Sequence, residues 1–119
     1  MSEKNLKRIL SLPYCCCGSD GNAVPQDMPF GTVHPRAFGA AAKFMRMLLD
    51  NSVSIGEACR RISGMPAQFF KLPELGILKP GFFADITVFD PETINSAADF
   101  TDPSLPATGI IMTFSGIEQ

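Results

Sequence analysis

The residues with the clearest chemical potential lie in PYCCCGSDGN, residues 13–22. Three adjacent cysteines suit a metal or redox site only if two or more thiolates converge on one point. In an extended chain only Cys15 and Cys17 share a face, and Cys59 is the one other cysteine of the sequence. The spacing therefore favours small packing residues with reduced thiols over a metal site or a disulfide framework.

Asp20 follows the cysteines within GSDG, where turn geometry alone explains an aspartate next to a glycine. The apolar run YCCC predicts a short strand, buried on both faces and bounded by Gly18. Such a strand delivers Asp20 at its C-terminal end, where a carboxylate is available for chemistry. The residue pattern alone does not decide whether Asp20 stabilises a turn or takes part in catalysis.

Helices are predicted on both sides of this stretch. Ser2 is predicted to cap a short helix that Pro13 ends, with its inner face formed by Leu6, Ile9 and Leu10. A loop is predicted from Asn22 to His34, rich in Gly, Pro, Asn, Asp and Gln.

A long helix is predicted from Pro35 or Arg36 to Leu49. Its expected inner face comprises Phe38, Ala41, Ala42, Met45, Leu48 and Leu49. The capping-box spacing of SIGE at Ser54 predicts the next helix, ending near Gly64, and MPAQFF predicts a further short helical turn.

The last third of the sequence changes to a strand pattern. Strands are predicted from Ala84 to Phe89, ended by Pro91, and from Ile110 to Phe114. Asp85 is interpreted as structural, accepting hydrogen bonds from backbone donors in the tight turn from Gly81.

Composition limits the classes of function. The 119 residues are 45% apolar with ten Phe and a net charge of −2, which predicts a chain that buries a core. The absence of a dense Lys/Arg block argues against nucleic acid or an anionic membrane as partner. Neither a signal peptide nor a run of about 20 apolar residues is present, so the expected location is the cytoplasm.

Several stretches in order resemble the C-terminal part of the N-acyl-D-amino-acid deacylases (D-aminoacylases), a family of the amidohydrolase superfamily. They are NLKRILSLPY, GSDG, HPRAFGAAAKFMRMLL, SIGEACRRISGMPAQFFKL, GILKPGFFADITVFDPETI and FTDPSLPATGI. The resemblance implies an α/β fold, the C-terminal fragment of a metal-dependent (β/α)8 barrel hydrolase followed by strands of a small β-sandwich. Residues 1–70 would be the last barrel strand and its helices, and residues 71–119 the incomplete sandwich.

The resemblance also implies roles for individual residues. Asp20 matches the family aspartate that contacts the catalytic metal and passes a proton from the metal-bound water to the departing nitrogen, at the strand end where barrel enzymes place their chemistry. Arg36 matches the arginine that pairs with the α-carboxylate of the substrate, although by itself it also fits an exposed residue in a first helical turn. Ser19 and Gly21 would bind the N-acyl-D-amino acid substrate, and zinc would be the metal. His34 is interpreted as structural.

The sequence contains one histidine, whereas the superfamily builds its metal site from an H-x-H pair and further histidines. We therefore expect a C-terminal piece of a deacylase-like hydrolase that is inactive alone, because the metal ligands are missing. The alternative is a non-enzymatic binding or assembly module, whose apolar faces bind the missing barrel part or a second copy.

Overall fold

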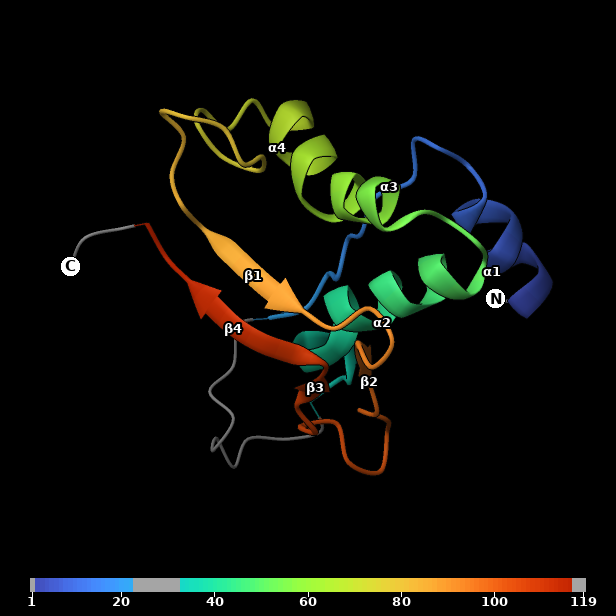
Figure 1. Cartoon of the computed structure of the whole chain (residues 1–119). Coiled ribbons are helices and arrows are strands. Elements are labelled where there is room, and N and C mark those ends of the chain that lie inside the picture. Colours follow the sequence, from blue (N-terminus) through green and yellow to red (C-terminus); the bar gives the residue numbers. More distant parts are fainter. Residues whose placement is uncertain (1, 23–32, 117–119) are drawn as a thin grey trace.

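The computed structural model describes residues 2–22 and 33–116. Its helices lie together on one side, and two short antiparallel ribbons of strands lie against them (Figure 1). The helical elements are α1 (Glu3–Leu10), α2 (Arg36–Asp50), α3 (Ile55–Cys59), the π-helix η1 (Arg60–Gly64) and α4 (Met65–Phe69). The strands are β1 (Ile86–Phe89), β2 (Asn95–Ser96), β3 (Ala107–Thr108) and β4 (Ile110–Phe114).

The first helix forms as its sequence predicts, with one difference on its inner face. The Ser2 hydroxyl accepts a hydrogen bond from the backbone N–H of Asn5 at 3.3 Å, which confirms the cap. Leu10 is only 1% exposed, whereas Ile9 is 40% exposed. The helix packs through Leu6 and Leu10, which are four residues apart, so Ile9 is rotated to the side.

The long helix α2 confirms its predicted bounds to within a residue, and Ala42, Met45 and Leu48 are buried as predicted, but the buried stripe also includes Gly39. The buried positions are Gly39, Ala42, Met45 and Leu48, while Phe38 is half-buried and Ala41 is exposed. A Cβ at position 39 would collide with the side chain of Ser96, so β2 approaches the helix backbone here. A glycine carries no hydrophobic signal, and for this reason the pattern did not include Gly39 in the inner face.

The third predicted helix starts as expected but does not end at Gly64. The Ser54 hydroxyl accepts from the N–H of Glu57 at 3.3 Å, which confirms Ser54 as the N-cap, whereas the Glu57 carboxylate binds Arg60 and Arg61. Helical structure then runs without a break through η1 into α4. Gly64 allows close packing instead of ending the helix, because a Cβ there would lie 3.4 Å from both Gly76 O and Ile77 Cγ2.

The strand predicted at Tyr14–Cys17 is absent, and residues 15–22 contain neither helix nor strand. Cys15 and Cys17 are half-buried and Cys16 is exposed, so the prediction of a strand buried on both faces is wrong for this structure. A strand exists only where its N–H and C=O groups pair with a neighbouring strand. No such neighbour lies among the described residues. Most of the loop predicted from Asn22 to His34 falls outside the described ranges.

Both strands predicted in the last third are present and pair with each other. β1 and β4 are antiparallel, with Ile86 opposite Phe114 and Val88 opposite Met112. Asp85 accepts hydrogen bonds from Gly116 N at 2.9 Å and Ser115 Oγ at 3.3 Å. Its structural role is confirmed, but its partners lie after β4 and not in the turn from Gly81.

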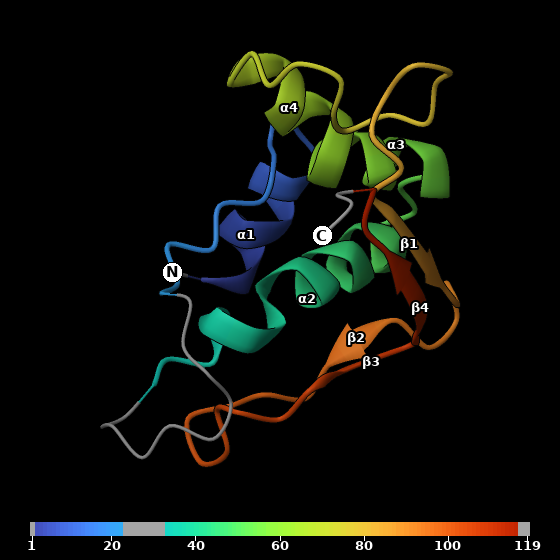
Figure 2. The same ribbon diagram turned by 90° about the vertical axis from the view of Figure 1, so that its left-hand side faces the viewer.

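The second ribbon, β2 with β3, was not predicted and joins the strand region to α2. Ile94, 2% exposed, lies just before β2 and packs in the same core as Met45 and Leu48. Figure 2 shows this ribbon lying along α2 on the side away from α4. Strands of two residues carry no alternation of apolar and polar residues, and therefore leave no sequence signal.

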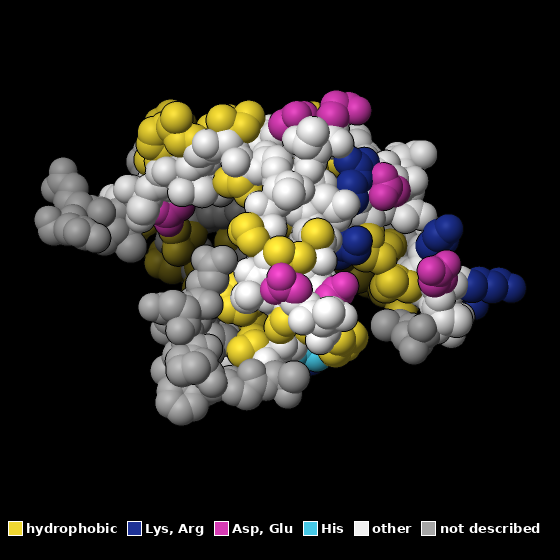
Figure 3. Space-filling view, turned by 90° about the horizontal axis from the view of Figure 1, so that it is seen from below, with side chains coloured by type: hydrophobic (Ala, Val, Ile, Leu, Met, Phe, Trp, Pro, Cys, Tyr) yellow, Lys and Arg dark blue, Asp and Glu magenta, His cyan; other side chains and the backbone are white. Residues whose placement is uncertain are grey.

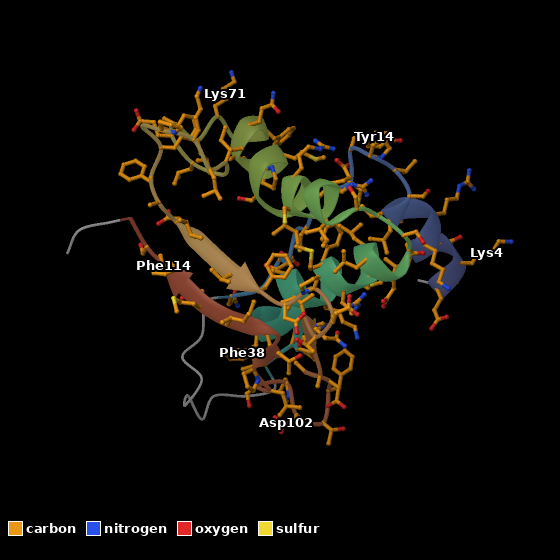
Figure 4. The ribbon with its side chains drawn as sticks, viewed as in Figure 1. Lys4, Tyr14, Phe38, Lys71, Asp102 and Phe114 are labelled. Atoms are coloured by element: carbon orange, nitrogen blue, oxygen red, sulfur yellow. The ribbon has the colours of Figure 1, made fainter. Side chains whose placement is uncertain are left out.

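Large apolar side chains remain at the surface of the first ribbon. All five residues of β4 are exposed, including Ile111 at 64% and Phe114 at 52%. Phe114 lies near the end of β4, away from the helices (Figure 4), and hydrophobic side chains are spread over the lower face of the molecule (Figure 3). None of the helices among the described residues is both long enough and apolar enough to cross a membrane.

Candidate functional site

The structure brings together the two side chains that the sequence singles out for chemistry. Arg36 Nη2 lies 3.1 Å from Asp20 Oδ2, and the two side chains are 44% and 89% exposed. The segment after α1 carries Asp20 past the other helices toward the N-terminal end of α2, where Arg36 is the first residue (Figures 1 and 2). An exposed carboxylate and a guanidinium thus face solvent side by side.

The backbone around Asp20 is shaped by local contacts. Asp20 has a φ of 48°, in the left-handed region that aspartate tolerates better than most residues. The Ser19 hydroxyl accepts a hydrogen bond from Gly21 N at 3.2 Å. A Cβ at Gly21 would lie 3.0 Å from the Cα of Ala37, so this glycine permits close contact with the first turn of α2. These contacts fix Asp20 beside Arg36.

His34 has a structural contact on each side. Its Nδ1 accepts a hydrogen bond from the backbone N–H of Arg36 at 3.1 Å, which caps α2 where Pro35 offers no side-chain cap. Its ring meets the edge of Phe100, with centroids 5.0 Å apart and planes at 78°. Both contacts agree with the structural interpretation of this histidine. Phe100 was not identified from the sequence, because a contact so distant along the chain has no local pattern.

Three of the cysteines, Cys15, Cys17 and Cys59, are half-buried as packing residues are, whereas Cys16 is exposed. All four are free thiols. Burial, followed by the charges of Cys16 and Cys15, raises the pKa of the Cys17 thiol, and burial raises the pKa of Cys59. A thiol with a raised pKa stays protonated at neutral pH and is a poor nucleophile and metal ligand.

The side chains around Asp20 do not form a zinc site by themselves. Structural and catalytic zinc sites use three or four protein ligands. Across residues 2–22 and 33–116, no three His, Cys, Asp or Glu side chains come together so that they could hold a metal ion. One carboxylate beside an arginine therefore needs further ligands from elsewhere before zinc can bind.

A second charged cluster, which we call the Glu57 clamp, consists of Glu57, Arg60 and Arg61. Glu57 Oε1 and Oε2 accept hydrogen bonds from Arg60 at 2.8 and 2.7 Å, and Oε1 also accepts from Arg61 Nε at 2.8 Å. Hydrogen bonds from Arg60, then from Arg61, hold the pKa of Glu57 at about 2, against a usual value of 4.5. The spacings of three and four residues were visible in the sequence but were not used.

The lowered pKa of Glu57 predicts a pH-dependent loss of stability. Because the folded pKa lies below the unfolded one, the ionised carboxylate stabilises the fold above about pH 4.5, and this stabilisation disappears as the pH falls toward about 2. Thermal unfolding of the chain and of Glu57→Gln should therefore show a lower midpoint for the variant at pH 7 and converging midpoints between pH 4.5 and 2. A constant difference over that range would contradict the assignment.

Three curated relatives from Alcaligenes xylosoxydans xylosoxydans match this chain in sequence. They are N-acyl-D-aspartate deacylase, 31% identical over 113 residues, N-acyl-D-glutamate deacylase, 30% over 112, and D-aminoacylase, 36% over 115. Each alignment covers 92% of this chain, which spans only 22% of the relative's length. No family model matches the chain.

Solved structures agree with the sequence relatives. N-acyl-D-glutamate deacylase from Bordetella bronchiseptica, in complex with zinc and a phosphonate mimic of the tetrahedral intermediate, matches with a TM-score of 0.84 and 33% identity. A D-aminoacylase described as defining a novel subset of amidohydrolases matches with a TM-score of 0.82 and 32% identity. Each match covers 98% of this chain and 24% of the solved chain. In sequence and in fold, this chain is thus a homologue of one segment of the N-acyl-D-amino-acid deacylases.

Proposed function

We propose that this chain forms part of a hydrolase that cleaves the amide bond of N-acyl-D-amino acids, and that it supplies a catalytic carboxylate and a substrate-binding arginine. The observation that carries the proposal is the 3.1 Å pair of Asp20 and Arg36, two exposed side chains on segments that belong to the deacylase match. Related enzymes act on N-acyl-D-aspartate and N-acyl-D-glutamate, so we assign this chain the same class of substrate.

Asp20 is the proposed proton carrier. Its carboxylate accepts a proton from the attacking water and delivers it to the nitrogen of the departing D-amino acid, which could not otherwise leave as a neutral amine. Its 89% exposure leaves one oxygen free for water while the other meets Arg36. The left-handed φ of 48° is a departure from ordinary backbone of the kind that clusters at functional sites.

Arg36 is the proposed anchor for the substrate. A guanidinium presents five N–H donors in a planar fork, which matches the two oxygens of a carboxylate. One nitrogen, Nη2, meets Asp20, and the remaining donors can bind the α-carboxylate of the N-acyl-D-amino acid. An arginine shared between the proton carrier and the substrate would place the scissile amide next to Asp20. Ser19 and Gly21 line the same turn and would contact the bound substrate.

For the remaining architecture we propose the arrangement that the family resemblance implies, and the match to enzymes several times longer supports it. Residues 1–70 are assigned to the last strand and helices of a (β/α)8 barrel, and residues 71–119 to strands of a β-sandwich. In that setting residues 15–22 gain the neighbouring strands that they lack here, and the rest of the barrel contributes the zinc ligands. The chain alone should consequently be inactive.

The exposed apolar residues of β4 favour a second candidate, an assembly module without catalytic function. Side chains such as Ile111, at 64% exposure, are costly to leave in water and indicate a covered face. The two candidates make different predictions, because only the hydrolase candidate requires the chain to function as part of a barrel.

A graft experiment tests the proposed function. The segment of Alcaligenes D-aminoacylase that matches this chain is replaced by this chain, and the zinc-loaded graft is assayed with N-acetyl-D-glutamate, N-acetyl-D-aspartate and a neutral N-acetyl-D-amino acid. We expect turnover by the graft of at least one substrate and none by the isolated chain. A folded, zinc-loaded graft without turnover, or turnover by the isolated chain, would contradict the proposal.

A further inference from the structure

The Glu57 clamp reaches beyond its own helix to the end of α1. Arg61 Nη1 donates to Leu10 O at 2.6 Å, and Arg60 Nη2 donates to Pro13 O at 2.8 Å. Arg61 is only 4% exposed, so its charge is removed from water and satisfied by Glu57 and by this carbonyl. A buried arginine held in this way is expensive to displace. The clamp thereby fixes the chain between Leu10 and Pro13.

Residues 14–22, which follow this point and carry Asp20, make few hydrogen bonds to other described residues. Among the described residues, the hydrogen bonds of this stretch include Cys15 N to Leu12 O at 3.1 Å, Gly21 N to the Ser19 hydroxyl at 3.2 Å, and a long contact of 3.9 Å from Cys15 Sγ to the adjacent carbonyl. At its far end Asp20 pairs with Arg36. The segment is thus held by the clamp at its start, and at its end by the ion pair and by the close contact of Gly21 with the first turn of α2.

The helical geometry explains how one carboxylate can serve both arginines. Arg60 and Arg61 lie three and four residues after Glu57, the two spacings that place side chains on the same helical face. The π-helix begins at Arg60, and π-turns within helices are frequent at functional sites. Glu57 orients two guanidiniums so that both can bind the carbonyls at the end of α1.

We propose that Glu57 is a positioning residue: through Arg60 and Arg61 it anchors the start of the segment that carries Asp20, and so sets the place of Asp20 relative to α2. The catalytic consequence rests on the function proposed above, whereas the anchoring itself is a property of this chain. Without the Glu57 carboxylate the two arginines lose their common partner, and the segment should open locally while the helices stay packed.

The three adjacent cysteines report on the segment directly. Iodoacetamide labelling of the 119-residue chain, resolved by tandem mass spectrometry, gives a rate for each thiol. In Glu57→Gln we expect the rates at half-buried Cys15 and Cys17 to rise about tenfold, the change that corresponds to loss of one charge-assisted hydrogen bond. Exposed Cys16 should change little, and Cys59 in α3 should not change.

Two further variants sharpen the experiment. Asp50→Asn is the matched control, since it removes a carboxylate that pairs with Arg46 at 2.8 Å but does not touch the segment, and its cysteine rates should equal those of the unmodified chain. Arg60→Lys keeps the charge, but one ammonium cannot bind both Glu57 oxygens and Pro13 O, so it should raise the Cys15 and Cys17 rates as Glu57→Gln does.

These outcomes distinguish the positioning role of Glu57 from a purely stabilising role. They also test that role independently of the proposed enzymatic function. Unchanged Cys15 and Cys17 rates in Glu57→Gln, or an equal rise at Cys59, would overturn it. In the graft, Glu57→Gln should lower kcat about tenfold with KM little changed, because Asp20 is displaced while Arg36 is not. The labelling result does not depend on turnover, so an inactive graft would count against the enzyme alone.

Discussion

Replacing Asp20 by Asn in the grafted enzyme is expected to lower kcat by about 10²–10⁴-fold, the contribution of a positioned general acid or base. An amide of the same size can accept a hydrogen bond from water but cannot take up its proton at neutral pH. Substrate binding through Arg36 should persist, so KM should change much less than kcat. Steady-state kinetics with N-acetyl-D-glutamate and N-acetyl-D-aspartate provide the measurement.

The structure indicates that this substitution changes chemistry more than folding. Asparagine tolerates the left-handed backbone of position 20, φ 48°, about as well as aspartate does. The lost pair with Arg36 is exposed, and such pairs contribute about 0–1 kcal/mol. The graft with Asp50→Asn, which removes an exposed carboxylate elsewhere, should keep its activity. Equal kcat values for Asp20→Asn and the parent graft would exclude Asp20 as the proton carrier.

The sequence predicted those parts of the fold that depend on neighbours along the chain. Ser2 and Ser54 mark the starts of their helices, because each N-cap hydroxyl accepts a hydrogen bond from a backbone N–H three residues later. Strands β1 and β4 were predicted from runs of residues with high β-propensity. Gly39 was left out of the predicted inner face and Gly64 was interpreted as a helix end, because the role of each is to let another segment approach, which depends on residues far away in the chain. Local chemistry fixes where elements begin, while contact between elements decides which face is buried.

The same distinction between local and long-range contacts applies to the candidate site. Nothing in the spacing of Asp20 and Arg36 requires them to meet. The family resemblance implied a separate role for each residue, at the metal and at the substrate carboxylate, and the ion pair between them was not predicted. The Glu57 clamp could have been suspected from carboxylate and arginines three and four residues apart, but its bonds to Leu10 and Pro13 could not. The strand expected at Tyr14–Cys17 is absent for a related reason, since no strand among the described residues lies beside it to pair with it.

Replacing Arg36 by Gln is expected to lower kcat/KM in the graft by about 30-fold or more, the loss for truncating a charge-assisted pair worth about 2 kcal/mol or more. The effect should appear mainly in KM, because the carboxylate of the substrate is held in the ground state as well as in the transition state. Arg36→Lys keeps the charge without the two-nitrogen fork and should lose about tenfold. Arg8→Lys, at an exposed position of α1, is the control and should leave the kinetics unchanged.

A second substrate separates binding of the α-carboxylate from positioning of Asp20. Arg36 touches Asp20 as well, so its loss could lower activity by releasing that carboxylate instead of the substrate. An N-acetyl-D-amino-acid amide has no α-carboxylate to bind, so the parent graft should discriminate strongly against it and Arg36→Gln should discriminate little. If both substrates lost activity equally in the variant, the arginine would act through Asp20. A double-mutant cycle of Asp20→Asn and Arg36→Gln then gives the coupling free energy between the two residues. If their roles are independent, the free-energy losses of the two single variants add, and if they share a role, the losses do not add.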